Sequence, residues 1–259
     1  MKKTKQAITI VATLGMVAVV PLAALADENG ATYESNGVVE FIPSTDPTDP
    51  VDPNNPDPEV PVNPVDPTDP EGPNPGTNGP LSIDYASSLD FGINKISNKD
   101  MTYYAKAQEL RSDEGSTYVP NYVQISDNRG TNAGWTLTVK QEGQLSNATA
   151  QNKELTGSQI QFVDPTVASK TEVTPPTPAD VITLDPNGAE SPVMSAKQSA
   201  GAGLWVDRWG TVEEMAGDQG EKVQKTKAIS LTIPGKTPKD AVKYSTKLTW
   251  NLSDVPGNE

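Results

Sequence analysis

Apolar and polar residues alternate along the C-terminal two thirds of the chain, and this alternation limits the fold more than any other feature. From residue 81 onwards, short alternating segments such as 135–139 are separated by glycine, asparagine and proline. Successive side chains of a strand point to opposite faces, so this period predicts strands with one buried face. No region keeps a helical period, and only 211–217 or 238–242 leave room for a short helix. We expect residues 81–259 to form an all-β domain, either an antiparallel sandwich or an irregular barrel.

Two segments of this region are less regular. Residues 89–93 alternate and are counted among the expected strands. Residues 164–200 contain six prolines, which interrupt strands and predict long surface loops around one short expected strand at 181–184.

An acidic, proline-rich stretch precedes the alternating region. Residues 43–80 hold 13 of the 24 prolines and contain six Asp-Pro steps. Proline fixes the backbone and removes an amide donor, and the acidic side chains repel one another. The stretch is also compatible with a ligand for a proline-recognition module, but its position between two segments favours a disordered, extended spacer. Its contour would be on the order of 120 Å at the polyproline rise per residue.

A short apolar segment lies before the spacer. Within residues 27–42, residues 38–42 read Val-Val-Glu-Phe-Ile and are flanked by Asn-Gly and Pro. This composition predicts a short N-terminal β-strand. A single strand cannot fold alone, so the segment either pairs with an edge of the C-terminal domain or is disordered.

The first 26 residues have the layout of a secretory signal peptide. Three lysines are followed by an apolar run, a proline and the sequence Ala24-Leu25-Ala26. The alternative is a permanent membrane anchor, but the run is shorter than the roughly 20 residues that span a bilayer. We expect cleavage before Asp27 and secretion. No later segment resembles a membrane span, a sortase signal or a lipobox, so any attachment to the cell is expected to be non-covalent.

The composition excludes several kinds of function. Cysteine and histidine are absent, which removes disulfides, thiolate nucleophiles, histidine bases and the common zinc ligands. The formal charge of −14 becomes −17 when the three leader lysines are removed, and no basic cluster suits nucleic acid. Non-specific adhesion to an anionic wall polymer is equally disfavoured.

Two Trp-x-Leu motifs stand out among the expected strands. Trp135 and Leu137 share one strand face, as do Trp250 and Leu252. Large apolar side chains on one face favour core packing over ligand stacking. The recurrence of the motif predicts two neighbouring strands whose tryptophans form one cluster.

These motifs, together with the other segments, resemble the WxL family of Gram-positive surface proteins. The resemblance rests on the leader, the Asp-Pro spacer, the segments 80–92 and 96–108, and both motifs, of which the closing Trp-Asn-Leu-Ser-Asp-Val-Pro is the most specific. It implies a small all-β WxL domain over residues 81–259 that attaches non-covalently to the bacterial surface, with peptidoglycan as ligand. It also implies assembly with other WxL-locus proteins and a membrane-anchored partner.

A third aromatic segment, residues 203–210, places Trp205, Asp207 and Trp209 on one strand face and Leu204 and Val206 on the other. Two tryptophans around a carboxylate are compatible with a platform for stacking sugars or contacting a partner. The alternative is a tryptophan pair that faces the core.

We therefore expect a non-catalytic wall-binding protein without metal or cofactor. The alternative is a subunit of a surface complex, in which the WxL domain binds protein instead of glycan. A wall-remodelling enzyme is disfavoured, because no acidic residues show the paired spacing of glycoside hydrolases.

Overall fold

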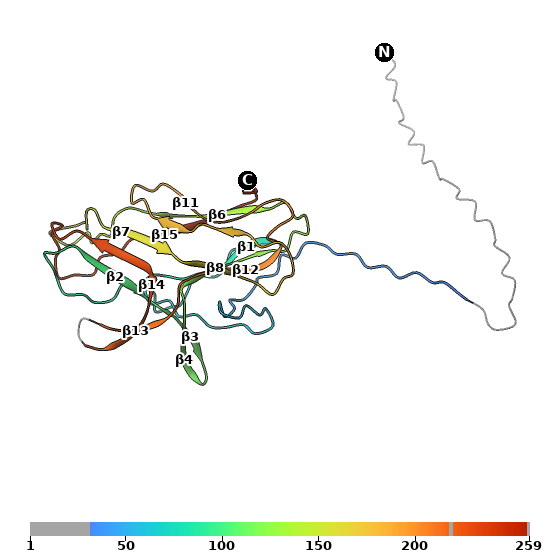
Figure 1. Ribbon diagram of the computed structural model, residues 1–259, viewed down its shortest axis with the longest axis horizontal. Coiled ribbons are helices and arrows are strands. Elements are labelled where there is room, and N and C mark those ends of the chain that lie inside the picture. Colours follow the sequence, from blue (N-terminus) through green and yellow to red (C-terminus); the bar gives the residue numbers. More distant parts are fainter. Residues whose placement is uncertain (1–31, 218–219, 258–259) are drawn as a thin grey trace, which may run out of the picture. The chain divides into compact units, whose positions relative to one another are not determined.

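The computed structural model describes residues 32–217 and 220–257, so the signal peptide expected at residues 1–26 lies outside the described residues. The described chain forms strands and no helix, and every pair of strands is antiparallel (Figure 1). No described segment forms a helix able to cross a membrane. The all-β antiparallel prediction is confirmed, with open sheets instead of a closed barrel. The short helices allowed at 211–217 and 238–242 do not form.

Three sheets and one hairpin make up the fold. The first sheet has the order β1 (Leu81–Ala86), β5 (Tyr122–Asp127), β12 (Gly203–Trp209), β8 (Pro165–Ala168). The second has the order β10 (Val181–Thr183), β7 (Gln159–Val163), β14 (Lys222–Ile233), β13 (Glu213–Ala216), and β2 (Met101–Lys106) also pairs with β14. The third has the order β15 (Leu248–Ser253), β6 (Trp135–Gln141), β11 (Ser191–Ala196), β9 (Thr177–Pro178). The hairpin consists of β3 (Gln108–Ser112) and β4 (Gly115–Val119), and it projects from the sheets (Figure 1).

The three sheets enclose one main hydrophobic core. Strands β5, β6, β7, β12 and β14 each contribute fully buried apolar side chains to it. Alternation explains this arrangement, because the inward positions of β6 are buried and the intervening positions are only half-buried.

Strand β5 departs from the expectation of one buried face, since all six of its residues are buried. Its inward side chains Val123 and Ile125 belong to the main core, whereas Tyr122 belongs to a second apolar cluster with Leu204 and Val206 of β12. Val51 from the proline-rich stretch completes this second cluster. The first sheet is therefore covered on both sides.

The proline-rich stretch is thus not the free spacer that its composition predicts. Residues 49–67, here called the proline strap, lie against the first sheet around Val51, which is 1% exposed, and against β3 around Pro64, which forms an antiparallel bridge with Leu110. Aspartate side chains shape the strap through local turns, such as Asp52 accepting a 2.9 Å hydrogen bond from the Asn54 amide. The strap also folds back on itself, with the Val62 amide donating to the Pro50 carbonyl at 2.8 Å.

Other differences from the sequence expectation are local. Residues 32–42 form no strand, and side chains such as Val38 and Phe41 are exposed. This expectation was wrong because the segment has no partner strand within the described chain. Residues 89–93 also form no strand.

Residues 164–200 contain the expected strand at 181–184 as β10, but also the three strands β8, β9 and β11 where loops were expected. Proline is accommodated there at strand ends and at an irregularity. Pro165 begins β8, and Pro192 lies where the register between β11 and β6 shifts.

Candidate functional site

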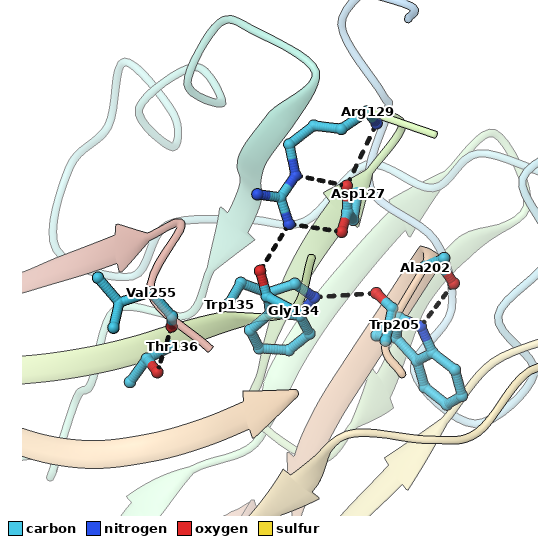
Figure 2. A network of polar contacts seen from close by, with 9 residues as sticks. Asp127, Arg129, Gly134, Trp135, Thr136, Ala202, Trp205 and Val255 are labelled. Carbon is cyan, nitrogen blue, oxygen red and sulfur yellow. Dashed lines mark hydrogen bonds and ion pairs between the residues drawn. The ribbon is translucent and has the colours of Figure 1, made fainter. Parts of the chain in front are cut away.

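The first Trp-x-Leu motif lies at the start of β6, and its tryptophan and leucine side chains are entirely buried. Trp135 and Leu137 are both 0% exposed. The indole Nε1–H of Trp135 donates a 2.9 Å hydrogen bond to the Gly201 carbonyl (Figure 2). Gly201 has a φ of 70°, and a Cβ there would lie 2.8 Å from the same indole nitrogen. Glycine at this position therefore leaves the space that the buried indole ring occupies.

The second motif lies on the neighbouring strand. In β15, Trp250 is opposite Val139 and Leu252 is opposite Leu137 of β6. The prediction that the two motif strands are neighbours is confirmed. Both Trp250 and Leu252 are partly buried and pack against the main core.

The tryptophans contact one another differently from the expected cluster. Trp250 packs against Trp209, with ring centroids 6.2 Å apart, and Trp209 meets Phe162 at 4.9 Å. Trp135 lies four positions along β6 from the residue opposite Trp250. The aromatic cluster therefore joins one motif tryptophan to β12 and β7, and the other motif tryptophan occupies its own pocket.

A polar network supports the first motif from the end of β5. Arg129 forms a bidentate pair with the buried Asp127, with both contacts at 2.8 Å, and also donates to the Gly134 carbonyl at 2.7 Å (Figure 2). Thr136 donates from Oγ1 to the Val255 carbonyl at 2.8 Å. These contacts join the loop before β6 to β5 and to the tail after β15, so they act on the motif's position and not on a ligand.

The third aromatic segment follows the predicted alternation, but both of its faces are buried. Trp205 and Trp209 face the main core, and Leu204 and Val206 face the second cluster. Trp205, Asp207 and Trp209 are 4%, 0% and 1% exposed. They form no exposed stacking platform in this structure, because the second and third sheets cover that face.

Asp207 places a carboxyl group inside the core. Neither side-chain oxygen has a well-formed hydrogen bond, and the neighbouring Trp209 indole N–H also lacks one. Burial raises the pKa of Asp207 to about 8, against smaller opposing effects of the Thr166 backbone amide and the Arg208 charge. The group is out of reach of any ligand, and its effect is on stability.

The middle residues of the two motifs point the other way. Thr136 and Asn251 lie on the outer face of the third sheet, where polar side chains alternate with the buried Trp and Leu positions. We call this surface the outer motif face; its residues are Thr136, Thr138, Lys140, Thr249, Asn251 and Ser253, with the adjacent Glu142 and Glu190.

Glu190 connects the two motif strands across this face. Its carboxylate accepts a 2.7 Å hydrogen bond from Asn251 Nδ2 and a 3.0 Å hydrogen bond from Thr138 Oγ1. Glu142 similarly accepts from Thr249 Oγ1 at 2.8 Å, and this bond, followed by that of Lys140, lowers the pKa of Glu142. The result is an open array of hydroxyl, amide and carboxylate groups, suited to hydrogen bonding with a polar polymer.

Sequence reasoning missed this surface because the tryptophans drew attention to the buried half of each motif. The signal was present in the positions between them, which are consistently polar in both motif strands. Two shallow hollows elsewhere contain no motif residue: one lies beside Arg111 and the other beside Gly210.

Comparison with known proteins identifies the fold's family. A family model described as "WxL domain surface cell wall-binding" matches residues 28–256, which include the proline strap and both motif strands. Comparisons with curated proteins and with solved structures give no match.

Proposed function

Because this chain belongs to the WxL family of surface cell wall-binding domains, we propose that it is a secreted, non-catalytic protein that attaches non-covalently to peptidoglycan through the outer motif face. Secretion follows from the leader at residues 1–26, and the wall is that of a Gram-positive cell. The observation that carries the proposed surface is the division of each motif: Trp and Leu are directed inward, and the residue between them is directed outward.

The chemistry of the outer motif face fits peptidoglycan better than teichoic acid. Thr138, Asn251 and Glu190 offer donors and acceptors from three strands or their ends, and glycan hydroxyls and acetamido groups need both. The chain is acidic overall, so a polyphosphate polymer would be repelled at low salt.

Sedimentation with purified walls tests the proposal. Walls freed of protein and teichoic acid are mixed with the mature chain and pelleted, and bound protein is measured. We expect the wild type to pellet, and the double variant Thr138→Ala/Asn251→Ala to bind about thirtyfold more weakly, since each of the two lost hydrogen bonds is worth about 1 kcal/mol.

The matched control is Gln161→Ala/Thr183→Ala. These residues form a similar exposed cross-strand hydrogen bond of 3.0 Å, but on the second sheet. The control should pellet like the wild type. Equal binding by the Thr138/Asn251 variant would show that the outer motif face is not the contact surface.

The same experiment distinguishes direct binding to peptidoglycan from binding to protein partners. Failure of the wild type to pellet with stripped walls would exclude direct peptidoglycan binding. Pelleting only with walls that keep their proteins would favour the alternative, a subunit held by other WxL-locus proteins or by a membrane-anchored partner. Trp135→Ala should destabilise the fold and remove no contact with the wall, because the Trp135 side chain is wholly buried.

A further inference from the structure

The proline strap is bound to the first sheet in the manner of a peptide ligand. Its sequence contains the tetrapeptide Pro-Val-Asp-Pro twice, at residues 50–53 and 64–67. Val51 of the first copy is buried in the second apolar cluster beside Tyr122 and Val206. The prolines Pro53 and Pro64 are buried as well.

A buried glutamine contacts the backbone of each tetrapeptide. Gln124 of β5 accepts a 2.8 Å hydrogen bond from the Val51 amide and donates a 3.0 Å bond to the Asp49 carbonyl. Its side-chain amide thus pairs with the strap as a neighbouring strand would. Gln108 of β3 donates a 2.8 Å bond from Nε2 to the carbonyl of Val65.

The two glutamines are held in place by groups outside the strap. Asp84 accepts hydrogen bonds from Gln124 Nε2 at 3.0 Å and from the hydroxyls of Ser82 and Ser126 at 2.7 Å. The phenol of Tyr85 donates to Gln108 Oε1 at 2.7 Å. The first sheet, through Gln124, and β3, through Gln108, therefore present fixed hydrogen-bonding groups to the extended strap backbone, which lowers the entropy lost on binding.

We propose that the outer face of β1, β5 and β12, together with the adjoining strand β3, is a recognition site for extended Pro-Val-Asp-Pro peptides, filled in cis by residues 49–67 and filled in trans by the same segment of a second copy. Proline-rich peptides suit such a site, because their backbone is already extended and loses little freedom on binding. Exchange between copies is a low-cost route to association, because the contacts made in trans are those already made in cis. The exposed linker of residues 68–75 spans on the order of 26 Å when extended, enough to reach a neighbouring copy.

Peptide capture tests the site. Residues 71–75 of the mature chain are replaced by a protease site, and the cut protein is unfolded in urea with a tenfold excess of fluorescent peptide of residues 46–68, then refolded. We expect this peptide to copurify with the domain in place of the severed strap. A Val51→Asp peptide should be captured at about a tenth of that level or less, since a carboxylate would replace a buried methyl pair.

The control peptide carries Val60→Asp. Val60 belongs to the same strap but is 60% exposed, so this peptide should be captured like the wild type. Absence of capture of the wild-type peptide, or equal capture of the Val51→Asp peptide, would overturn the recognition site.

Disulfide trapping tests whether the strap of one copy binds to a second copy, and it is practicable because the chain has no native cysteine. Asp57 of the strap forms an ion pair with Lys170, so Asp57→Cys chains are mixed with Lys170→Cys chains, unfolded, refolded together and oxidised. We expect a covalent dimer, and none with Lys227→Cys, which changes an exposed lysine of the second sheet. If the double variant cross-links within one chain and the mixed single variants give no dimer, the strap binds only in cis and the trans part is refuted.

Discussion

Asp207 should make the protein less stable as the pH rises from acid to neutral. In the unfolded chain this carboxyl loses its proton near its ordinary pKa of 3.8, whereas in the folded chain burial keeps the proton up to a pH of about 8. The folded state binds more protons between these values, so the free energy of unfolding falls across that window and levels off above it. Over the whole window the loss is on the order of 5 kcal/mol, comparable to the total stability of a small domain.

Replacement by asparagine isolates this contribution. Asp207→Asn retains a buried polar group of similar size but cannot ionise, so its stability relative to the wild type should rise with pH. Between pH 5 and pH 7 we expect the difference in unfolding free energy to grow by about 3 kcal/mol, because both pH values lie inside the window. Urea titrations followed by tryptophan fluorescence at several pH values measure this difference.

The pH dependence is the informative quantity, because any fixed cost of asparagine in the core cancels from it. An Asp113→Asn variant at an exposed turn corrects for the removal of one negative charge. A stability difference between Asp207→Asn and the wild type that stays constant from pH 5 to pH 7 would refute the argument.

Three further substitutions test the support of the first motif by urea unfolding. Gly201→Ala should lower the free energy of unfolding by about 3 kcal/mol, because its Cβ would lie 2.8 Å from the Trp135 indole nitrogen. The control Gly130→Ala has the same φ but open space around it, and it should lower the free energy of unfolding by about 1 kcal/mol. Trp135→Phe should cost about 2 kcal/mol or more, since it leaves the Gly201 carbonyl without its donor, and intact stability would show that this bond is unimportant. Arg129→Ala should lower the free energy of unfolding by about 3 kcal/mol, because it leaves the buried Asp127 carboxylate without its ion-pair partner. The control Arg111→Ala removes an exposed ion pair and should lower it by under about 1 kcal/mol. Equal losses would contradict the role of burial.

The sequence predicted the features that depend on local alternation. Strands β6 and β15 follow from a two-residue period that is visible within each motif, and their pairing was predicted from the recurrence of the motif. The division of β12 into a tryptophan face and a leucine face is confirmed for the same reason. The burial of both faces could not be predicted, because the segments that cover them are distant in sequence.

Docking of the proline strap could not be predicted from its composition. Gln124 and Ser126 alternate with apolar residues and therefore resemble the solvent face of an ordinary strand. Their burial depends on a segment about 75 residues earlier in the chain, whose residues are mostly polar or proline with single valines between them. Long-range complementarity of this kind leaves no periodic signal.

The folded strap also sets how far the protein can extend. An uninterrupted spacer would span on the order of 120 Å, but here the chain is attached at Ser44, whose amide donates to the Asn128 carbonyl at 3.3 Å. Tension on the N-terminal side of Ser44 would act on that hydrogen bond first. It would then detach the strap from the domain, beginning at the strap's N-terminal end and the buried Val51. Each released segment would add length without unfolding the sheets, so the strap gives a wall-bound molecule a reserve of extension under mechanical load.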